Sequence, residues 1–288
     1  MPLLIVATVT ALVALAGLAV TCTVCIDREQ LRDAPDVLDT RFFDVGPYLC
    51  AAGLFFFLKR LTHEESVRLS KSIGWDITAR IYDLEGLFVA GLQDVLPGVL
   101  YPVLSAFYMF GFPYLLVAAP VLYFLTPTLG SLKELLVAYL LNYVVGSICY
   151  TLFIAYGPRV HVSEHVDGMM YDLYPETQEL TSAVSSNTDV FPSLHTSLSV
   201  VVLLFAWQTR REQPRWFTVA SVVTASVVLS TMALGIHWLT DVVAGVLLAV
   251  GSVVVARRLV STVDGEPTPP SESIEGAPNE QPSIRSDD

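Results

Sequence analysis

Long apolar runs separated by short polar connections dominate the chain. Six of the runs are candidates for membrane-spanning helices: residues 3–25, 98–125, 134–156, 196–208, 216–236 and 242–256. A helix needs roughly 20 apolar residues to cross a bilayer, and most of these runs supply them. The pattern predicts an all-α, polytopic membrane protein, folded as a six-helix transmembrane bundle.

The N-terminal third differs from the rest of the chain. The first run carries no charge from Leu3 to Cys25 and has no basic residues before it, so we expect a membrane anchor rather than a cleaved signal peptide. The run from Pro47 to Leu58 is short for a span and, with residues 84–97, predicts interfacial or re-entrant helices. Residues 1–97 are therefore expected to form an anchor followed by an interfacial segment.

Residues 98–258 hold the other five runs and are expected to form the transmembrane bundle. Pro102, Pro113 and Pro120 predict kinks in the first of these helices, which neighbouring helices tolerate in a membrane. The tail over residues 259–288 is rich in proline, serine and acidic residues. This composition is typical of disordered segments.

The composition supports a membrane setting and narrows the partners. Of the 288 residues, 53% are hydrophobic and 15% charged, against about 25% charged in soluble domains, and the mean hydropathy is +0.57. The net charge of −12 argues against a nucleic-acid partner. Only three of the 16 basic residues are lysines (Lys59, Lys71 and Lys133), and an acidic, lysine-poor chain is compatible with a halophilic source.

The distribution of basic residues predicts an orientation. Arginines 210, 211 and 215 lie between the fourth and fifth runs, and arginines 257 and 258 follow the sixth, so these ends and the C-terminus are expected in the cytoplasm. The connection over residues 157–193 has one basic residue against six acidic ones and is expected outside. Six spans would also place the eight basic residues of 26–97 outside, against the rule, although long loops obey it weakly.

With this topology, three polar positions converge on the outer face. His237 and Asp241 are four residues apart, so on a helical turn they share a face, and the carboxylate can orient the imidazole for nucleophilic attack. His195 and Ser193 open a helix whose backbone N–H groups suit a phosphate, and Arg159 offers the planar fork that matches one. These residues predict phosphoryl transfer through a phosphohistidine, without metal or cofactor.

Metal binding is the competing chemistry. Two histidines and an aspartate could hold zinc, and His161 and His165 form an additional pair at a spacing of four. Neither an adjacent cysteine nor an H-E-x-x-H motif accompanies them, so His63, His161 and His165 are interpreted as surface residues, with His161 a possible substrate contact. Two of the four cysteines form a C-x-x-C pair at the end of the first run, which favours packing over a redox or metal site.

The same residues resemble a known family. The type-2 phosphatidic acid phosphatase superfamily carries the motifs K-x6-R-P, P-S-x-H and S-R-x5-H-x3-D; here P-S-L-H runs from Pro192 to His195, and the third motif runs from Ser230 to Asp241. Thr231 replaces the motif's arginine, as in the inositol phosphorylceramide synthase branch. The first motif matches poorly, because Pro158-Arg159 reverses its R-P order and Leu152 occupies the lysine position.

The resemblance implies roles and a reaction. His237 would be the nucleophile, Asp241 its orienting partner, and His195 the acid that protonates the leaving oxygen, while Arg159 and Ser193 would bind phosphate at the outer membrane boundary. A site with fewer cations suits a phosphodiester better than a phosphomonoester dianion. The expected substrate is a phospholipid or an isoprenoid or other lipid phosphate, and transfer to a polyol such as inositol is favoured. Plain lipid phosphate hydrolysis, a non-catalytic transporter or channel, and an inactive family member remain alternatives.

Overall fold

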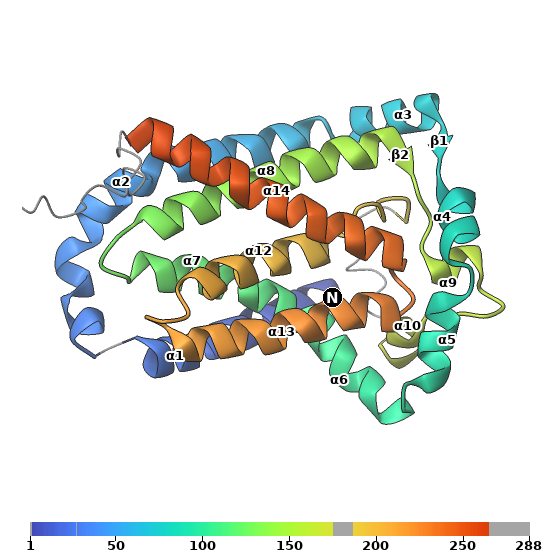
Figure 1. The fold of residues 1–288 in the computed structure, drawn as a ribbon, viewed down its shortest axis with the longest axis horizontal. Coiled ribbons are helices and arrows are strands. Elements are labelled where there is room, and N and C mark those ends of the chain that lie inside the picture. The colour runs from blue at the N-terminus through green and yellow to red at the C-terminus, as the bar shows by residue number, and fades with distance from the viewer. Residues whose placement is uncertain (1, 27, 175–186, 265–288) are drawn as a thin grey trace, which may run out of the picture.

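The computed structural model describes residues 2–26, 28–174 and 187–264 (Figure 1). The N-terminal part comprises α1 (Pro2–Cys25), α2 (Arg28–Leu61), α3 (His63–Ile73), β1 (Trp75–Asp76), α4 (Thr78–Glu85) and α5 (Phe88–Val95). The remainder comprises the single turn η1 (Gly98–Leu100), α6 (Tyr101–Ala106), the π-helical turn η2 (Phe107–Gly111), α7 (Phe112–Phe124), α8 (Gly130–Leu152), β2 (Phe153–Ile154), α9 (Pro158–His161), α10 (Met169–Leu173), α12 (Leu194–Gln208), α13 (Pro214–Ala233) and α14 (Leu239–Asp264).

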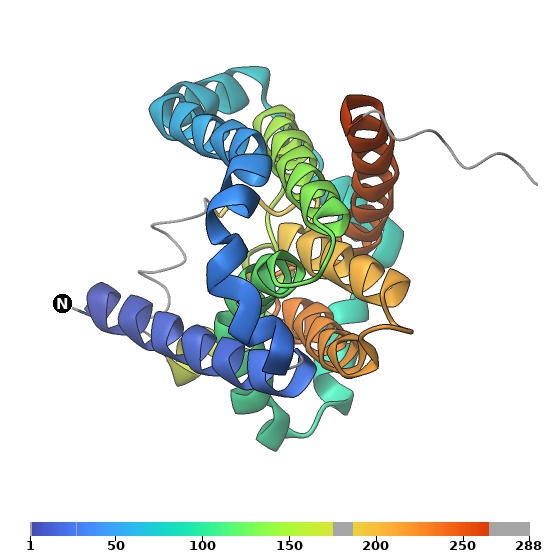
Figure 2. The same cartoon turned by 90° about the vertical axis from the view of Figure 1, so that its left-hand side faces the viewer.

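The bundle is arranged around α12. This helix packs against α7, α8, α13 and α14, and it lies among them in both views (Figures 1 and 2). The main core cluster is formed by side chains from these five helices, including Leu122, Leu135, Phe205, Trp216 and Ala249. We refer to the end where α13 meets α14 as the His237 end, and to the end where α12 meets α13 as the Arg210 end.

The described residues confirm an all-α polytopic protein. Six helical stretches are long and apolar enough to cross a membrane: Leu4–Cys25, Leu38–Lys59, Gly98–Phe124, Gly130–Leu152, Pro214–Ala233 and Leu239–Val263. The central helix α12 is apolar but has only 15 residues. Cys22 and Cys25 are free and pack against the core cluster, as expected. The described residues therefore contain six apolar helices of spanning length and one shorter apolar helix, α12.

One expectation about the N-terminal part is wrong. The run from Pro47 to Leu58 is not an isolated interfacial helix, because α2 continues through Pro47 and its stretch from Leu38 to Lys59 has the length and composition of a span. The charge of Arg41 is accommodated at the Arg210 end, where its guanidinium donates to the Phe124 and Thr126 carbonyls after α7. The first residues of α2 thus lie at that end, and the chain reaches the His237 end near Lys59.

Residues 75–95 are attached to the His237 end. The two-residue strands β1 and β2 pair in parallel, the Ile77 N–H donates to the Ile154 carbonyl, and the Tyr156 N–H donates to the Thr78 hydroxyl. The short helices α4 and α5 follow directly, so much of the stretch over 84–97 is helical, and its interfacial position stays a prediction. The N-terminal part therefore contributes contacts at the end where the candidate site lies.

The helix expected over residues 98–125 is interrupted. Pro102 and Pro113 lie in the first turns of α6 and α7, and the π-helical turn at Phe107–Gly111 separates the two. At the other end of the chain, α14 continues to Asp264, six residues beyond the expected boundary at 258. Residues 265–288 of the expected disordered tail lie outside the described residues.

Candidate active site

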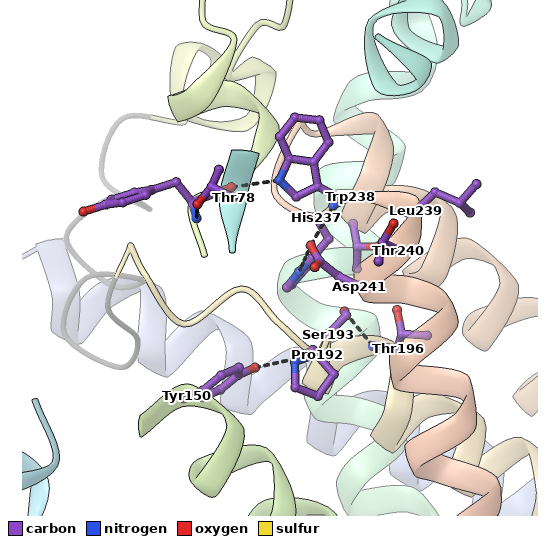
Figure 3. Close-up of polar contacts among 12 residues, drawn as sticks. Thr78, Tyr150, Pro192, Ser193, Thr196, His237, Trp238, Leu239, Thr240 and Asp241 are labelled. Carbon is purple, nitrogen blue, oxygen red and sulfur yellow. Dashed lines mark hydrogen bonds and ion pairs between the residues drawn. The ribbon is translucent and has the colours of Figure 1, made fainter. Parts of the chain in front are cut away.

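The turn between α13 and α14 brings His237 and Asp241 together (Figure 3). The His237 side chain is 5% exposed and the Asp241 side chain is fully buried, and Nδ1 of the imidazole lies 3.6 Å from Oδ2 of the carboxylate. This separation is longer than a hydrogen bond, and such contacts are often long in sites without substrate. The two side chains are thus adjacent and buried on one face, as the spacing of four predicted, while the orienting role of Asp241 stays a prediction.

Backbone hydrogen bonds determine the shape of this turn. The Thr231 carbonyl accepts from the N–H groups of Ile236 and His237, and Gly235 adopts a φ of +67°, a conformation that favours glycine. Asp241 Oδ2 also accepts from the Trp238 N–H at 2.8 Å, which caps the N-terminus of α14. The same carboxylate therefore caps the helix and faces the imidazole.

The surroundings of His237 favour its neutral form. Burial lowers the pKa of this histidine to about 3, and the nearby Arg159 guanidinium lowers the pKa further, while a hydrogen bond to the Val190 backbone opposes the shift. A neutral imidazole has the free lone pair that a nucleophile requires. The direction of this shift agrees with the nucleophilic role that the sequence predicts for His237.

The P-S-L-H segment is bonded directly to the His237 turn. Ser193 is the N-cap of α12, because its Oγ accepts from the Thr196 N–H at 3.3 Å, and its own N–H donates to the Asp241 carbonyl at 3.1 Å. Gly245, one turn after Asp241, permits this approach, since a Cβ there would lie 2.7 Å from the Ser193 carbonyl oxygen. The two motifs are thus fixed relative to each other by backbone contacts.

His195 lies in the first turn of α12, between aromatic rings and His237. Its ring centroid is 4.4 Å from that of Tyr108, nearly parallel, and 4.2 Å from that of Phe112. The His237 ring centroid is 6.3 Å away. Two imidazoles at this separation can both contact one phosphoryl group. The aromatic pair comes from the π-helical turn and the start of α7, and such turns are frequent at functional sites.

Arg159 completes the cluster from the short helix α9. Its backbone N–H donates to the Gly235 carbonyl at 3.0 Å. Its guanidinium lies over the Tyr171 ring, 4.4 Å from the ring centroid. Within the described residues, three buried polar atoms of the site have no hydrogen-bond partner: Arg159 Nη1, His237 Nδ1 and Asp241 Oδ1. Buried polar atoms are normally satisfied, so a cluster of unsatisfied ones indicates a place for a polar ligand.

The sequence profile of the PAP2 superfamily matches residues 88–255, more than half of the chain. The chain belongs to the PAP2 superfamily. Membership indicates phosphatase or phosphotransferase activity toward lipid phosphates. No curated protein and no solved structure matches the chain significantly. The match contains all five predicted site residues, which the fold brings to one end of the bundle.

Three residues that support the PAP2 site were missed in the sequence. Glu85, just before the matched region, accepts from the Leu239 N–H at 2.8 Å and the Thr240 N–H at 3.4 Å. Trp238 donates from its indole to the Tyr156 carbonyl and packs with Ile81. Gln93 bonds the Ala233 carbonyl at 2.9 Å and both backbone groups of Asp167. None of them has a local sequence signal, because each acts through a contact more than 70 residues away.

The predicted metal alternative has no support from the described residues. No group of three or more His, Cys, Asp or Glu side chains there is arranged to hold a metal ion. His161 and His165 are exposed, and the His161 ring lies 5.5 Å from that of Tyr82 and 6.1 Å from that of Trp238. His161 thus belongs to the rim of the His237 turn, which is compatible with a contact to substrate.

Proposed function

We propose that this PAP2 protein transfers the phosphoryl-bearing group of a membrane lipid to a hydroxylated acceptor through a phosphohistidine on His237. The observation that carries the proposal is the cluster of His237, Asp241, His195 and Arg159, in which the His237 imidazole faces the buried Asp241 carboxylate and, among the described residues, Arg159 Nη1 and Asp241 Oδ1 lack a hydrogen-bond partner. The cluster supplies a nucleophile, its orienting group, an acid and an anion-binding group.

In the first step, Nε2 of neutral His237 attacks phosphorus, and the N–P bond forms as the bond from phosphorus to the leaving oxygen breaks. His195 must be the imidazolium for this step; it donates a proton to that oxygen, so the alcohol leaves neutral and His195 becomes neutral. Asp241, which faces Nδ1, stabilises the positive charge that develops on the imidazole. In the second step an acceptor hydroxyl gives its proton to His195 and attacks phosphorus, and the P–N bond breaks to restore His237.

The anion-binding groups are few. Arg159 would use its free Nη1 and Ser193 its hydroxyl hydrogen, since the Ser193 oxygen already accepts from α12. Thr231 is fully buried, and its hydroxyl donates to the Val228 carbonyl, so it adds no charge where the motif has arginine. A site with one arginine suits the single negative charge of a phosphodiester, which favours a phospholipid donor.

We favour transfer over hydrolysis on the composition of the connection over residues 157–193. Its sequence has six acidic residues against one basic residue, and carboxylates accept hydrogen bonds from a polyol such as inositol. Hydrolysis uses the same residues with water as acceptor and would require no polyol. The distinction therefore rests on the acceptor, not on the nucleophile.

The decisive experiment follows a labelled phospholipid incubated with the purified protein, with and without inositol or another polyol. Acceptor-dependent formation of a labelled polyol phosphate or lipid supports transfer, whereas equal phosphate release in both reactions assigns hydrolysis. His237→Ala should abolish either reaction, and acid-labile label on the wild-type protein should disappear with it. Near-normal turnover by His237→Ala would remove the phosphohistidine from the mechanism.

A further inference from the structure

A second polar pocket lies at the His237 end, outside the cluster described above. It encloses about 180 Å³ between the end of α2, α3 and the segment from α8 to β2. Its lining combines two lysines, one aspartate and several hydroxyl-bearing side chains, and the complete set is Lys59, Ser66, Val67, Ser70, Lys71, Tyr150, Thr151, Ile154, Tyr156, Thr188 and Asp189. The charged groups of the lining therefore sum to one positive charge.

The lysines are unusual in this chain. Lys59 and Lys71 are two of only three lysines among 288 residues of net charge −12. Within the described part of the chain, no carboxylate forms an ion pair with either of them. The two lysines outnumber the single carboxylate of the lining, Asp189, so the pocket keeps a net positive charge in an acidic protein and is suited to an anion.

The location limits what the anion can be. Lys59 ends the spanning stretch of α2, so the pocket opens at a membrane boundary, where lipid phosphates lie. Its volume accommodates a head group but not acyl chains. We propose that this pocket binds a phosphate-bearing head group, with Lys59 and Lys71 on the phosphate and the Ser66 hydroxyl on one of the remaining oxygens. The hydroxyls of Ser70, Tyr150 and Thr151 already donate to backbone carbonyls.

The pocket is connected to the catalytic segments. The Tyr150 hydroxyl in its wall donates to the Pro192 carbonyl at 2.9 Å, and the Tyr156 carbonyl accepts from the Trp238 indole at 2.8 Å (Figure 3). Lys59, Ser66, Ser70 and Lys71 all precede the PAP2 match. The N-terminal part thus adds to the PAP2 core a second phosphate site, one hydrogen bond from the P-S-L-H segment.

Binding measurements test this inference independently of turnover. Every sample is full-length protein that carries Arg159→Ala. This substitution removes the phosphate-binding guanidinium of the proposed active site, so the binding measured here does not depend on whether the proposed reaction is correct. Detergent-solubilised protein is titrated with a short-chain phosphatidylglycerol and, separately, with a phosphatidylcholine of the same chains. We expect the anionic lipid to bind at least about tenfold more tightly, since hydrogen bonds to charged groups are the stronger ones.

Variants assign the binding to the pocket. Lys59→Ala with Lys71→Ala should weaken phosphatidylglycerol binding by about tenfold or more, and Lys59→Arg with Lys71→Arg should retain binding and so exclude misfolding as the cause. Arg68→Ala is the matched control, because Arg68 is an exposed cation on α3, the helix of Lys71, and pairs with Glu65 outside the lining. The affinity of this variant for phosphatidylglycerol should stay within about twofold of the parent.

Two results would overturn the proposal: unchanged affinity in the double alanine variant, or an equal loss in Arg68→Ala, which would indicate general surface attraction. Inorganic phosphate distinguishes the sources of the ligand. Competition by phosphate in the parent, absent in the double alanine variant, assigns the site to phosphate itself. Tight lipid binding without such competition assigns it to the head group of a membrane lipid. Equal binding of phosphatidylcholine would contradict the role of the lysine charges.

Discussion

The contact between Gly245 and the P-S-L-H segment gives the sharpest test of the site. Replacing Gly245 by alanine adds a Cβ that would lie 2.7 Å from the Ser193 carbonyl oxygen and 3.2 Å from the Thr196 Cβ. Both neighbours belong to the rigid start of α12, so neither can swing away as the end of a long side chain would. The start of α12 must move away from α14, and His195 moves with it.

The magnitude follows from two opposing effects. Inserting a methyl group into a tightly packed contact costs about 1–3 kcal/mol, whereas glycine to alanine inside a helix gains about 0.5–1 kcal/mol. The net loss of stability should therefore stay below about 2.5 kcal/mol. Catalysis is more sensitive, because a misplacement of about 1 Å can cost a factor of about 100. We expect kcat to fall about 10- to 100-fold in a protein that remains folded.

The assay compares Gly245→Ala with Gly251→Ala by thermal unfolding in detergent and by turnover of a labelled phospholipid. Gly251 lies on the same helix, and a Cβ there would meet nothing within 4 Å. Gly251→Ala should keep its activity and its Tm or raise the Tm slightly. Wild-type kcat in Gly245→Ala would refute the argument that the contact between α12 and α14 positions the site.

Three further predictions concern charge and orientation. Asp241→Asn preserves an acceptor for the Trp238 N–H but not the negative charge, so kcat should fall by about 10²–10⁴ with little change in Tm; unchanged kcat would exclude an orienting role. Burial raises the pKa of Glu85 above 4.5, partly opposed by the hydrogen bonds from Thr240 and Leu239, so the folded state binds this proton more tightly than the unfolded chain. Wild-type stability should therefore fall relative to Glu85→Gln as pH rises from 4.5 through the raised pKa, and a constant Tm difference over this range would contradict the assignment. After replacement of the four native cysteines, an impermeant thiol reagent should label a cysteine at residue 165 of intact cells but not one at 212, and the reverse pattern would place the site in the cytoplasm.

Much of the transmembrane architecture could be predicted because apolar length is a local property. Helices α8, α12 and α13 begin and end within about four residues of the predicted runs, and α14 begins three residues before its run but continues to Asp264. The prediction failed for α2, where Asp39, Arg41 and Asp44 interrupt the apolar pattern before Pro47. The sequence does not show that Arg41 donates to carbonyls at the end of α7, a tertiary contact that offsets the burial of its charge near the start of the candidate span.

The candidate site likewise combines residues with a local sequence signal and residues without one. The spacing of His237 and Asp241 and the proline before Ser193 are local signals, and the predicted topology placed both motifs at the same end of the bundle. Glu85 and Tyr108 carry no such signal, because their roles depend on contacts with residues 85 to about 155 positions away. Residues that hold a catalytic turn from outside its own motif become visible only once the fold is known.

The length of α12 explains why the substrate should be a lipid. Its 15 residues span about 22 Å at 1.5 Å per residue, less than the roughly 30 Å of a hydrocarbon core. Arg210 and Arg211 follow this helix and are predicted to lie at one membrane boundary. If α12 runs along the membrane normal from that boundary, its start, with His195, would lie about 8 Å short of the other one. A phosphate at that depth loses hydration whatever its ester, but the acyl chains of a lipid stay in hydrocarbon and hold its phosphate near the site, whereas a water-soluble ester has no such part. The same depth would limit bulk water at the proposed phosphohistidine and so favour an acceptor that is bound over one that diffuses in.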